Sequence, residues 1–281
     1  MLADLIGDEL ARLVGDEKGI MEIRMRVNRV LIVIDFHGNR REICKGGAKY
    51  IVRAKDIENV LARATNLSFY SASDEMKKGY IPCKHYRIGV GGEGISENGV
   101  LLAIKHVAFL VIRIPHQIFG VADSVIGEIV CKNGIKNTLV VSPTGGGKTT
   151  FLRELARLVS YTHNVVVIDE RYELCAMANG EPGLDIGDAD VISGVPKTYA
   201  YESAVRAMNP DVIVTDELFG AREIGAILDV MRCGVKVFAS VHANSVDSLR
   251  NSEYAPLVNA FDMAIVLGKN PVGKIIEKVR L

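Results

Sequence analysis

A glycine-rich segment at residues 142–150 combines the residue types that bind a phosphate chain. Open glycine backbone lets N–H groups wrap phosphate oxygens, and the positive end of a following helix attracts the same charge. The lysine of such a segment reaches the β- and γ-phosphates, and the next hydroxyl binds Mg²⁺. These residues are Ser142, Pro143, Thr144, Gly145, Gly146, Gly147, Lys148, Thr149 and Thr150. The segment therefore predicts a P-loop that binds ATP and Mg²⁺.

The residues on both sides of this segment support the interpretation. Residues 138–141 predict a strand and residues 150–159 predict a helix, which is the context that a P-loop requires. Ser142 departs from the pattern GxxxxGK[ST], whose first residue is glycine. We expect the loop to tolerate it, because three glycines still supply an open backbone. The alternative is an ordinary glycine-rich turn before a lysine, which the flanking strand and helix disfavour.

Two apolar runs end in an Asp-Glu pair. Residues 212–215 precede Asp216 and Glu217, and residues 165–168 precede Asp169 and Glu170. ATP chemistry needs a carboxylate for the metal at the tip of a strand near the P-loop. We expect Thr149 and either Asp216 or Glu217 to hold Mg²⁺, directly or through water, while the other pair can polarise the attacking water. The alternative for either pair is a solvated strand end.

A histidine ends a further apolar run at residues 235–241. His242 would lie where a side chain can sense the γ-phosphate, if this strand is a neighbour of the P-loop strand. A single histidine at a strand end is more often structural. The residue types alone leave both interpretations of His242 open.

The chain changes in character near residue 120. Before this point, short alternating runs predict a small α+β domain with an antiparallel sheet, and residues 91–99 predict a loop within it. After it, apolar strands alternate with helices, which is typical of a parallel sheet covered on both faces. The predicted strands of this second part are residues 138–141, 165–168, 212–215, 235–241 and 263–267. We therefore predict an N-terminal α+β domain at residues 1–118 and an α/β P-loop domain at residues 119–281.

Several elements of the N-terminal half are predicted from periodicity. The predicted elements are an amphipathic helical segment at 1–14, strands at 21–27, 30–34, 86–90 and 101–114, and a helix at 55–66. Helical spacing places five apolar residues of the first segment on one side, namely Leu2, Leu5, Ile6, Leu10 and Leu13. We expect this side to pack into the core, and a surface for a partner or membrane is the alternative.

Composition restricts the class of protein and its partners. Lys and Arg total 34, as do Asp and Glu, and there is no Trp, so nothing indicates a nucleic-acid partner. The apolar runs are too short to span a bilayer, and the N-terminus does not resemble a secretory signal. The five scattered cysteines form no CxxC pair, which argues against zinc and disulfides. We expect a cytoplasmic protein.

The four motifs together resemble those of the ATPases that power type II and type IV secretion. That superfamily carries a P-loop, an acidic box, a Walker B strand and a His box in this order. The matching segments here are residues 142–150, 168–173, 206–217 and 240–244. The resemblance implies a RecA-like P-loop ATPase domain that follows a smaller N-terminal domain.

A narrower resemblance is to the stage III sporulation protein AA family. The matching segments are residues 22–28, 70–71, 79–81, 86–90, 112–114, 137–143, 169–171, 185–187, 196–197 and 234–236. Ser142 and Pro143 are expected in that family. The resemblance implies a homohexameric ATPase that energises a channel between mother cell and forespore. It also implies a cytoplasmic protein held at a membrane by channel or secretion proteins.

The resemblance also implies roles for single residues. Lys148 and Thr149 would bind phosphate and magnesium, while Glu217 belongs to Walker B and His242 to the His box. In the acidic box, alignment places Asp169 at the catalytic position, whereas Glu170 has the usual side-chain length. We favour Glu170 and keep both. Arginines should complete the site, and the candidates are Arg87 and Arg113, with a surface or salt-bridge role as the alternative; Arg222 lacks the family's motif around it.

Other functions remain to be compared with ATP hydrolysis by a motor. A nucleic-acid motor would have a similar core, but the net charge of zero argues against it. A nucleotide-gated interaction module would bind ATP without turnover, and the acidic pairs argue against that. A nucleotide kinase needs an arginine-rich lid, whereas residues 179–196 are acidic and rich in glycine.

Overall fold

The chain divides into two compact units. The structure is a computed structural model that describes residues 2–65, 76–77, 79–84, 86–98, 100–178 and 180–281. The N-terminal unit comprises Met1–His116 with Ala176–Gly183, and the C-terminal unit comprises Gln117–Cys175 with Leu184–Leu281. The domain limits 1–118 and 119–281 stay a prediction. Of the segments used above, residues 70–71 lie outside the described residues.

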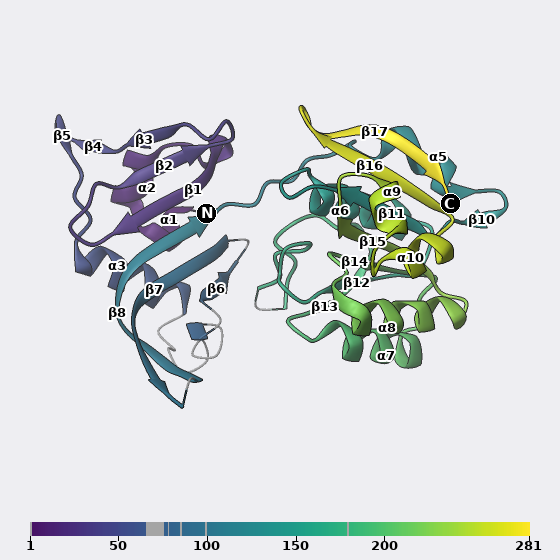
Figure 1. Ribbon diagram of the computed structural model, residues 1–281. Helices are drawn as coiled ribbons and strands as arrows, with labels where there is room; N and C mark the ends of the chain where they lie inside the picture. Colours follow the sequence, from purple (N-terminus) through teal and green to yellow (C-terminus); the bar gives the residue numbers. More distant parts are fainter. Residues whose placement is uncertain (1, 66–75, 78, 85, 99, 179) are drawn as a thin grey trace. The chain divides into compact units, whose positions relative to one another are not determined.

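An antiparallel six-stranded sheet forms the N-terminal unit, in the order β3-β2-β1-β8-β7-β6 (Figure 1). Its strands are β1 (Ile20–Arg26), β2 (Ile32–Asp35), β3 (Arg40–Glu42), β6 (Tyr80–Cys83), β7 (Tyr86–Glu97) and β8 (Val100–Arg113). The remaining elements are α1 (Leu2–Ile6), α2 (Asp8–Val14), the 3₁₀ turn η1 (Glu17–Gly19), α3 (Ala54–Ala64), and the short pair β4 (Cys44–Lys45) and β5 (Ala48–Lys49).

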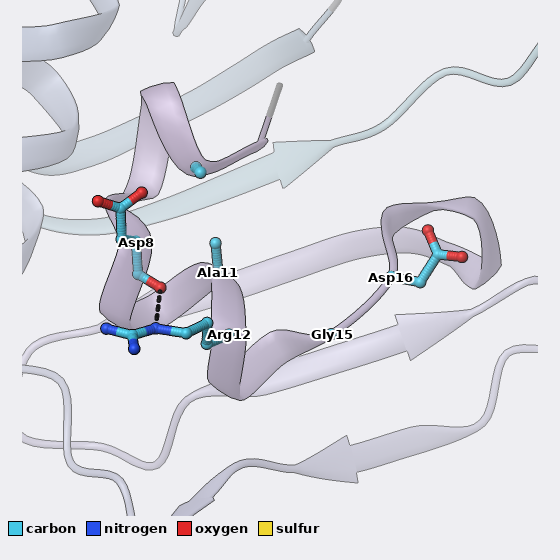
Figure 2. Close-up of a pocket in the computed structure, with 6 residues that line it drawn as sticks. Asp8, Ala11, Arg12, Gly15 and Asp16 are labelled. Carbon is cyan, nitrogen blue, oxygen red and sulfur yellow. Dashed lines mark hydrogen bonds between the residues drawn. The ribbon is translucent and has the colours of Figure 1, made fainter.

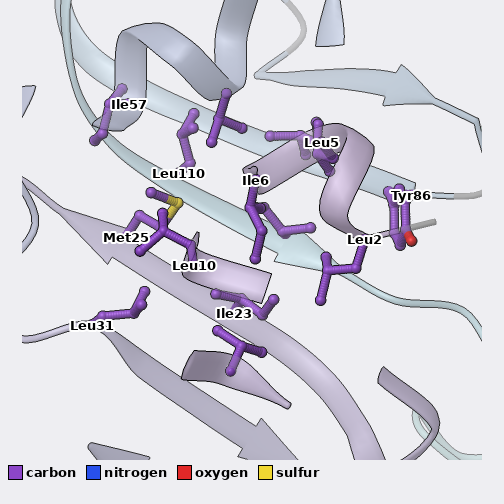
Figure 3. Close-up of a cluster of buried hydrophobic side chains, with 14 of the residues drawn as sticks. Leu2, Leu5, Ile6, Leu10, Ile23, Met25, Leu31, Ile57, Tyr86 and Leu110 are labelled. Carbon is purple, nitrogen blue, oxygen red and sulfur yellow. The ribbon is translucent and has the colours of Figure 1, made fainter. Parts of the chain in front are cut away.

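One face of this sheet carries the core of the N-terminal unit. Alternate residues of β1, such as Ile23 and Met25, are buried against apolar residues of α1, α2 and α3 (Figure 3). Leu2, Leu5, Ile6 and Leu10 belong to this cluster, and Leu13 packs against it. The prediction that the N-terminal segment packs into the core is therefore confirmed. Gly7, with φ 89°, interrupts the predicted continuous helix between α1 and α2.

The predicted loop at residues 91–99 is wrong over most of its length. Strand β7 continues to Glu97 and pairs with β8 as a long hairpin. Its glycines allow close cross-strand packing, because a Cβ on Gly91 would overlap the Phe109 ring and one on Gly92 would overlap the His106 carbonyl. Gly99 lies outside the described residues. So does Asn66, the last residue of the predicted helix that corresponds to α3.

A seven-stranded sheet forms the C-terminal unit, in the order β13-β12-β14-β15-β11-β16-β17 (Figure 1). Its strands are β11 (Thr138–Ser142), β12 (Val165–Asp169), β13 (Asp190–Ser193), β14 (Val212–Thr215), β15 (Lys236–His242), β16 (Met263–Lys269) and β17 (Val272–Arg280). The helices are α5 (Asp123–Ile129), α6 (Lys148–Ser160), α7 (Lys197–Ala207), α8 (Gly220–Arg232), α9 (Val246–Arg250) and α10 (Ala255–Ala260). A small hairpin of β9 (Val130–Cys131) and β10 (Gly134–Ile135) completes the unit.

The sheet is parallel except at one edge. Strands β11 to β16 pair in parallel and β17 pairs antiparallel with β16. Every residue of β11, β12 and β14 is buried, as expected for central strands with helices on both faces. The predicted α/β class and all five predicted strands are confirmed. Among the described residues, no helix is both long and apolar enough to cross a bilayer.

Candidate nucleotide site

Four neighbouring parallel strands end at one edge of the C-terminal sheet. The order β12-β14-β15-β11 brings the residues that follow these strands together, because parallel strands have their carboxyl ends on the same side. Asp169 ends β12, Asp216 follows β14, His242 ends β15, and the glycine-rich loop follows β11. Ser142 and His242 are direct neighbours in the register of β11 and β15. The sheet thus assembles the motifs predicted from the sequence.

The glycine-rich loop connects the last residue of β11 to the first residue of α6. Gly145 and Gly147 have φ of 77° and 90°, which favours glycine. At Gly146, a Cβ would overlap the side chain of Ser142, whose hydroxyl donates to the carbonyl of Pro143. Ser142 therefore fills the inside of the loop without strain, which explains why the loop accommodates a residue other than glycine at its first position.

Lys148 lies inside this loop with its ammonium group buried. Its Nζ donates to the backbone carbonyl of Ser142 over 2.9 Å and lies 2.7 Å from Nδ1 of His242. Burial lowers the pKa of Lys148 to about 8, and the nearby Glu217 carboxylate acts in the opposite direction. A lysine in a glycine-rich loop at the N-terminus of a helix suits a bound phosphate. The residues present fit the phosphate chain of a nucleotide.

His242 connects Lys148 to the carboxylate of Glu217. An ammonium group only donates, so Nδ1 of His242 accepts from Lys148 and Nε2 carries the proton. That Nε2 contacts Oε1 of Glu217, whose Oε2 accepts from Nη1 of Arg171 over 3.0 Å. The Glu217 backbone N–H donates to Ser240 Oγ over 2.9 Å. These contacts form a continuous chain Lys148–His242–Glu217–Arg171 across three strand ends.

Asp216 has an unused acceptor in a buried position. Its side chain is 4 % exposed, and among the described residues its Oδ1 has no hydrogen-bond partner. Burial raises the pKa of Asp216 to about 7, while Lys197 lowers it. Magnesium takes one or two protein carboxylates, with phosphate oxygens and water as its other ligands. Asp216 and the partly exposed Thr149 hydroxyl at the start of α6 therefore fit Mg²⁺, although the described part of the chain contains no ready group of three or more His, Cys, Asp or Glu ligands.

Asp169 is bonded differently from Asp216. Its buried carboxylate accepts from the backbone N–H groups of Glu173, Leu174 and Cys175 over 2.8–3.1 Å. Burial raises the pKa of Asp169, and these three hydrogen bonds oppose the rise. The buried guanidinium of Arg153 donates to the carbonyls of the same loop. Asp169 thereby holds the loop that follows β12, and Glu170 beside it is partly exposed.

The predicted arginines lie in the N-terminal unit. Arg87 on β7 and Arg113 on β8 are direct cross-strand partners. The Arg87 guanidinium lies 4.2 Å from the centre of the Tyr80 ring, and Arg113 is exposed opposite Glu22 of β1. The arginines thus share one face of the sheet. Arg222, on α8 of the C-terminal unit, is exposed.

Three residues of this region were not predicted from the sequence. They are Arg171, Lys197 and Ser240, which bond the side chain or backbone of Asp216 and Glu217. Lys197 had a detectable signal, because a lysine in the first turn of a helix lies at the unfavourable end of the helix dipole.

A pocket of the N-terminal unit contains none of the predicted site residues. Figure 2 shows the pocket, which is lined by Ala3, Asp8, Ala11, Arg12, Gly15 and Asp16. Arg12 Nε donates to the backbone carbonyl of Asp8 over 3.2 Å, so the guanidinium is bound to its own helix. The pocket adds no group to the nucleotide site.

Solved structures with a similar fold include a pilus retraction motor and an ATPase. The pilus retraction motor PilT with bound ADP has a TM-score of 0.60 at 16% identity, and covers 89% of this chain and 74% of that chain. The Legionella pneumophila ATPase DotB has a TM-score of 0.55 at 14% identity, and covers 88% and 72%. At these identities the likeness shows the fold alone. The predicted RecA-like fold is confirmed.

Sequence comparison gives the family. Stage III sporulation protein AA of Bacillus subtilis (strain 168) is 32% identical over 242 residues, which are 82% of this chain and 75% of that protein. The family described as "Sporulation stage III, protein AA" matches residues 1–276. A match over nearly the whole length shows that the chain belongs to the sporulation stage III, protein AA family, as the sequence motifs predicted.

Proposed function

We propose that this protein is a Mg²⁺-dependent ATP hydrolase. The observation that carries the proposal is the chain of contacts from Lys148 in the phosphate loop through His242 to Glu217. The Lys148 ammonium group contacts the His242 ring, and the same ring contacts the carboxylate of Glu217 at the end of β14. A phosphate-binding loop alone indicates nucleotide binding, whereas the adjoining carboxylates and histidine supply groups for hydrolysis.

The proposed reaction is attack of a water molecule on the γ-phosphorus, which breaks the bond from that phosphorus to the β–γ bridging oxygen and releases ADP and inorganic phosphate. The P-loop amides and Lys148 would bind the phosphates, and Thr149 and Asp216 would hold Mg²⁺, with Glu217 next to Asp216 in the chain. Bound magnesium supplies neutralisation of the charge that develops on the phosphate oxygens. Glu170 is the proposed group that accepts the water's proton, because the Asp169 carboxylate accepts three backbone N–H groups. Arg87 and Arg113 are the proposed arginines that neutralise the remaining charge.

The proposed role of this hydrolysis is mechanical. The fold is shared with a pilus retraction motor, and the family is one of sporulation proteins. We propose a cytoplasmic homohexamer, held at a membrane by channel or secretion proteins, that energises a channel between mother cell and forespore. Nucleic acid is not a proposed partner.

Lys148→Ala tests the hydrolase proposal. We expect the variant to lose ATP hydrolysis, measured as phosphate release, because nothing replaces the cation at the β- and γ-phosphates. Lys132→Ala, an exposed lysine of the same unit, is the matched control and should keep wild-type turnover. Near-normal turnover by a folded Lys148→Ala variant, checked by its circular dichroism and melting temperature, would overturn the proposal.

Sizing by light scattering tests the assembly. The protein is measured with and without a non-hydrolysable ATP analogue, and a hexamer is expected when the analogue is bound. The analogue is used at concentrations that saturate the site. A monomer in both conditions would contradict the proposal that the protein forms a hexameric ring without its membrane partner. Stimulation of turnover by DNA, lost steeply with salt, would instead indicate a nucleic-acid motor.

A further inference from the structure

Lys197 is a buried lysine next to the acidic end of β14. It is the first residue of α7, directly after Pro196, and its side chain is 4 % exposed. Both features are unfavourable, since burial removes water from the ammonium group and a cation is repelled by the positive end of a helix. Such a side chain is tolerated only when other groups replace the lost water.

Four oxygen atoms surround the Lys197 ammonium group. Nζ donates to the backbone carbonyls of Asp216 over 2.8 Å and of Glu217 over 2.7 Å. It also lies 3.3 Å from Oε2 of Glu223 and 3.4 Å from Oδ1 of Asp216. Glu223 in turn accepts from the backbone N–H of Phe219, just before α8. One cation thus connects α7 to the turn between β14 and α8.

The turn that Lys197 holds has an unusual backbone conformation. Glu217 has φ of 26°, a backbone conformation that residues with a side chain rarely adopt and that is strained. Such a conformation persists when surrounding contacts determine it. Contacts of this kind hold the turn. Lys197 donates to the carbonyls of Asp216 and Glu217, and the Glu217 N–H donates to Ser240 Oγ. This turn directs the Glu217 side chain to His242 and Arg171.

Lys197 leaves the carboxylate of Asp216 available. The ammonium group is within ion-pair distance of Oδ1, yet this oxygen has no hydrogen bond within the described part of the chain. The short contacts of Lys197 go to backbone carbonyls instead. The lysine therefore supplies positive charge near Asp216 without using the acceptor that a metal would need.

We propose that Lys197 is a positioning residue that holds Asp216 and Glu217 in the arrangement that binds magnesium beside the nucleotide. The inference rests on the proposed function for its metal and nucleotide, and adds a residue that acts through these two acids. A purely structural lysine would contribute to stability alone. A positioning lysine also determines how strongly magnesium supports nucleotide binding and turnover.

The test is the magnesium dependence of Lys197→Met, which keeps an unbranched side chain, one heavy atom shorter, and removes its charge and donors. We expect the magnesium concentration for half-maximal ATP hydrolysis to rise, and kcat to fall, by about 10–100-fold in total, as for other residues that orient metal ligands. Binding of a fluorescent ATP analogue in EDTA should be unchanged, because the hydrogen bonds and ion pairs of Lys197 within the described residues go to Asp216, Glu217 and Glu223. Magnesium should increase the affinity of the Lys197→Met variant for the analogue less than it increases the affinity of the wild type. This measurement does not depend on turnover.

Tyr201→Phe is the matched control from the same helix. Its hydroxyl is buried and bonds Thr215 Oγ1 over 2.9 Å, so the variant also weakens the contact between α7 and the end of β14. We expect a lower melting temperature with a wild-type magnesium dependence. Lys278→Met, at an exposed lysine paired with Glu128, controls for loss of a positive charge.

The outcomes separate this inference from the proposed function. If the wild type binds magnesium and nucleotide without hydrolysing ATP, the proposed function fails and the binding measurements still test Lys197. A folded Lys197→Met variant with the wild type's magnesium dependence overturns the inference, as does an equal shift in Tyr201→Phe. If Lys197→Met does not fold, Lys197→Gln is measured in the same way, because glutamine keeps a donor and lacks the charge. A raised half-maximal magnesium concentration in this variant supports the inference, and a wild-type magnesium dependence overturns it.

Discussion

The ends of β12 and β14 have similar sequences and different chemistry. Each strand is a buried apolar run followed by Asp-Glu, and the two strands are parallel neighbours in the sheet. At the end of β12, the Asp169 carboxylate binds three backbone N–H groups. At the end of β14, the Lys197 ammonium group binds two backbone carbonyls. In the first case the acid holds the backbone, and in the second a lysine holds it.

This difference determines which acid has free capacity for a ligand. Both oxygens of Asp169 accept hydrogen bonds, whereas Oδ1 of Asp216 has none within the described residues. Oδ1 of Asp216 is paired with the Lys197 ammonium group at 3.4 Å but accepts no hydrogen bond from the described residues, so this oxygen keeps acceptor capacity for a ligand. We infer that the two Asp-Glu pairs have divided structural and metal-binding roles between them.

The largest expected effect separates Glu170 from Asp169. Glu170→Gln should lower kcat by about 10²–10⁴-fold with an unchanged melting temperature, because it removes the proposed proton acceptor from a partly exposed position. Asp169→Asn should instead lower the melting temperature, with a smaller loss of kcat. Phosphate release and thermal melts are measured on both variants. The assignment is reversed if folded Asp169→Asn is inactive and Glu170→Gln retains turnover.

The next effect concerns the hydrogen bonds of Asp169 themselves. Asp169→Ala should lower the free energy of unfolding by about 3 kcal/mol, because it leaves three backbone N–H groups without their charged acceptor. Urea unfolding measures this change. Glu170→Ala, one residue away, is the control and should change stability by less than about 0.5 kcal/mol. Equal effects of the two substitutions would mean that the loop after β12 is not held by Asp169.

The sequence predicted the positions of the central strands and the acids at their ends. Buried parallel strands are continuous Val and Ile runs, so β11, β12 and β14 are recognisable without a structure. The edge strands β13 and β17 were missed, because β13 is a short, partly buried strand that begins with an aspartate, and β17 is largely exposed and mixes apolar residues with charges. The glycines of β7 were interpreted as a loop, although they allow close packing within a hairpin.

The division of roles between the two acidic pairs could not be predicted in this way. It depends on where the backbone after each strand turns, and on a lysine 19 residues before Asp216 in the chain. The dipeptide Asp-Glu does not by itself predict which N–H groups or carbonyls will surround its carboxylates in the folded chain. The local motif therefore identified the acids, and only the tertiary contacts distinguish Asp169 from Asp216.

The smallest expected effect is on the pH dependence of stability, measured in EDTA. Burial raises the pKa of Asp216 to about 7, from about 3.8. The folded protein therefore binds this proton more tightly than the unfolded chain, and the free energy of unfolding falls as the pH rises between these values. Asp216→Asn removes this loss, so its stability relative to the wild type should increase from pH 5 to pH 8, by on the order of 1 kcal/mol.

Asp169→Asn is the control for this experiment. Asparagine has one side-chain acceptor oxygen, which cannot replace both oxygens of a carboxylate that binds three N–H groups. This variant should be less stable than the wild type at both pH 5 and pH 8. If Asp216→Asn is also destabilising at pH 8, Asp216 contributes to holding the folded chain as Asp169 does, and the contrast between the two strand ends disappears. A stabilised Asp216→Asn variant that no longer responds to magnesium would show that this acid is retained at a cost in stability for the sake of its ligand.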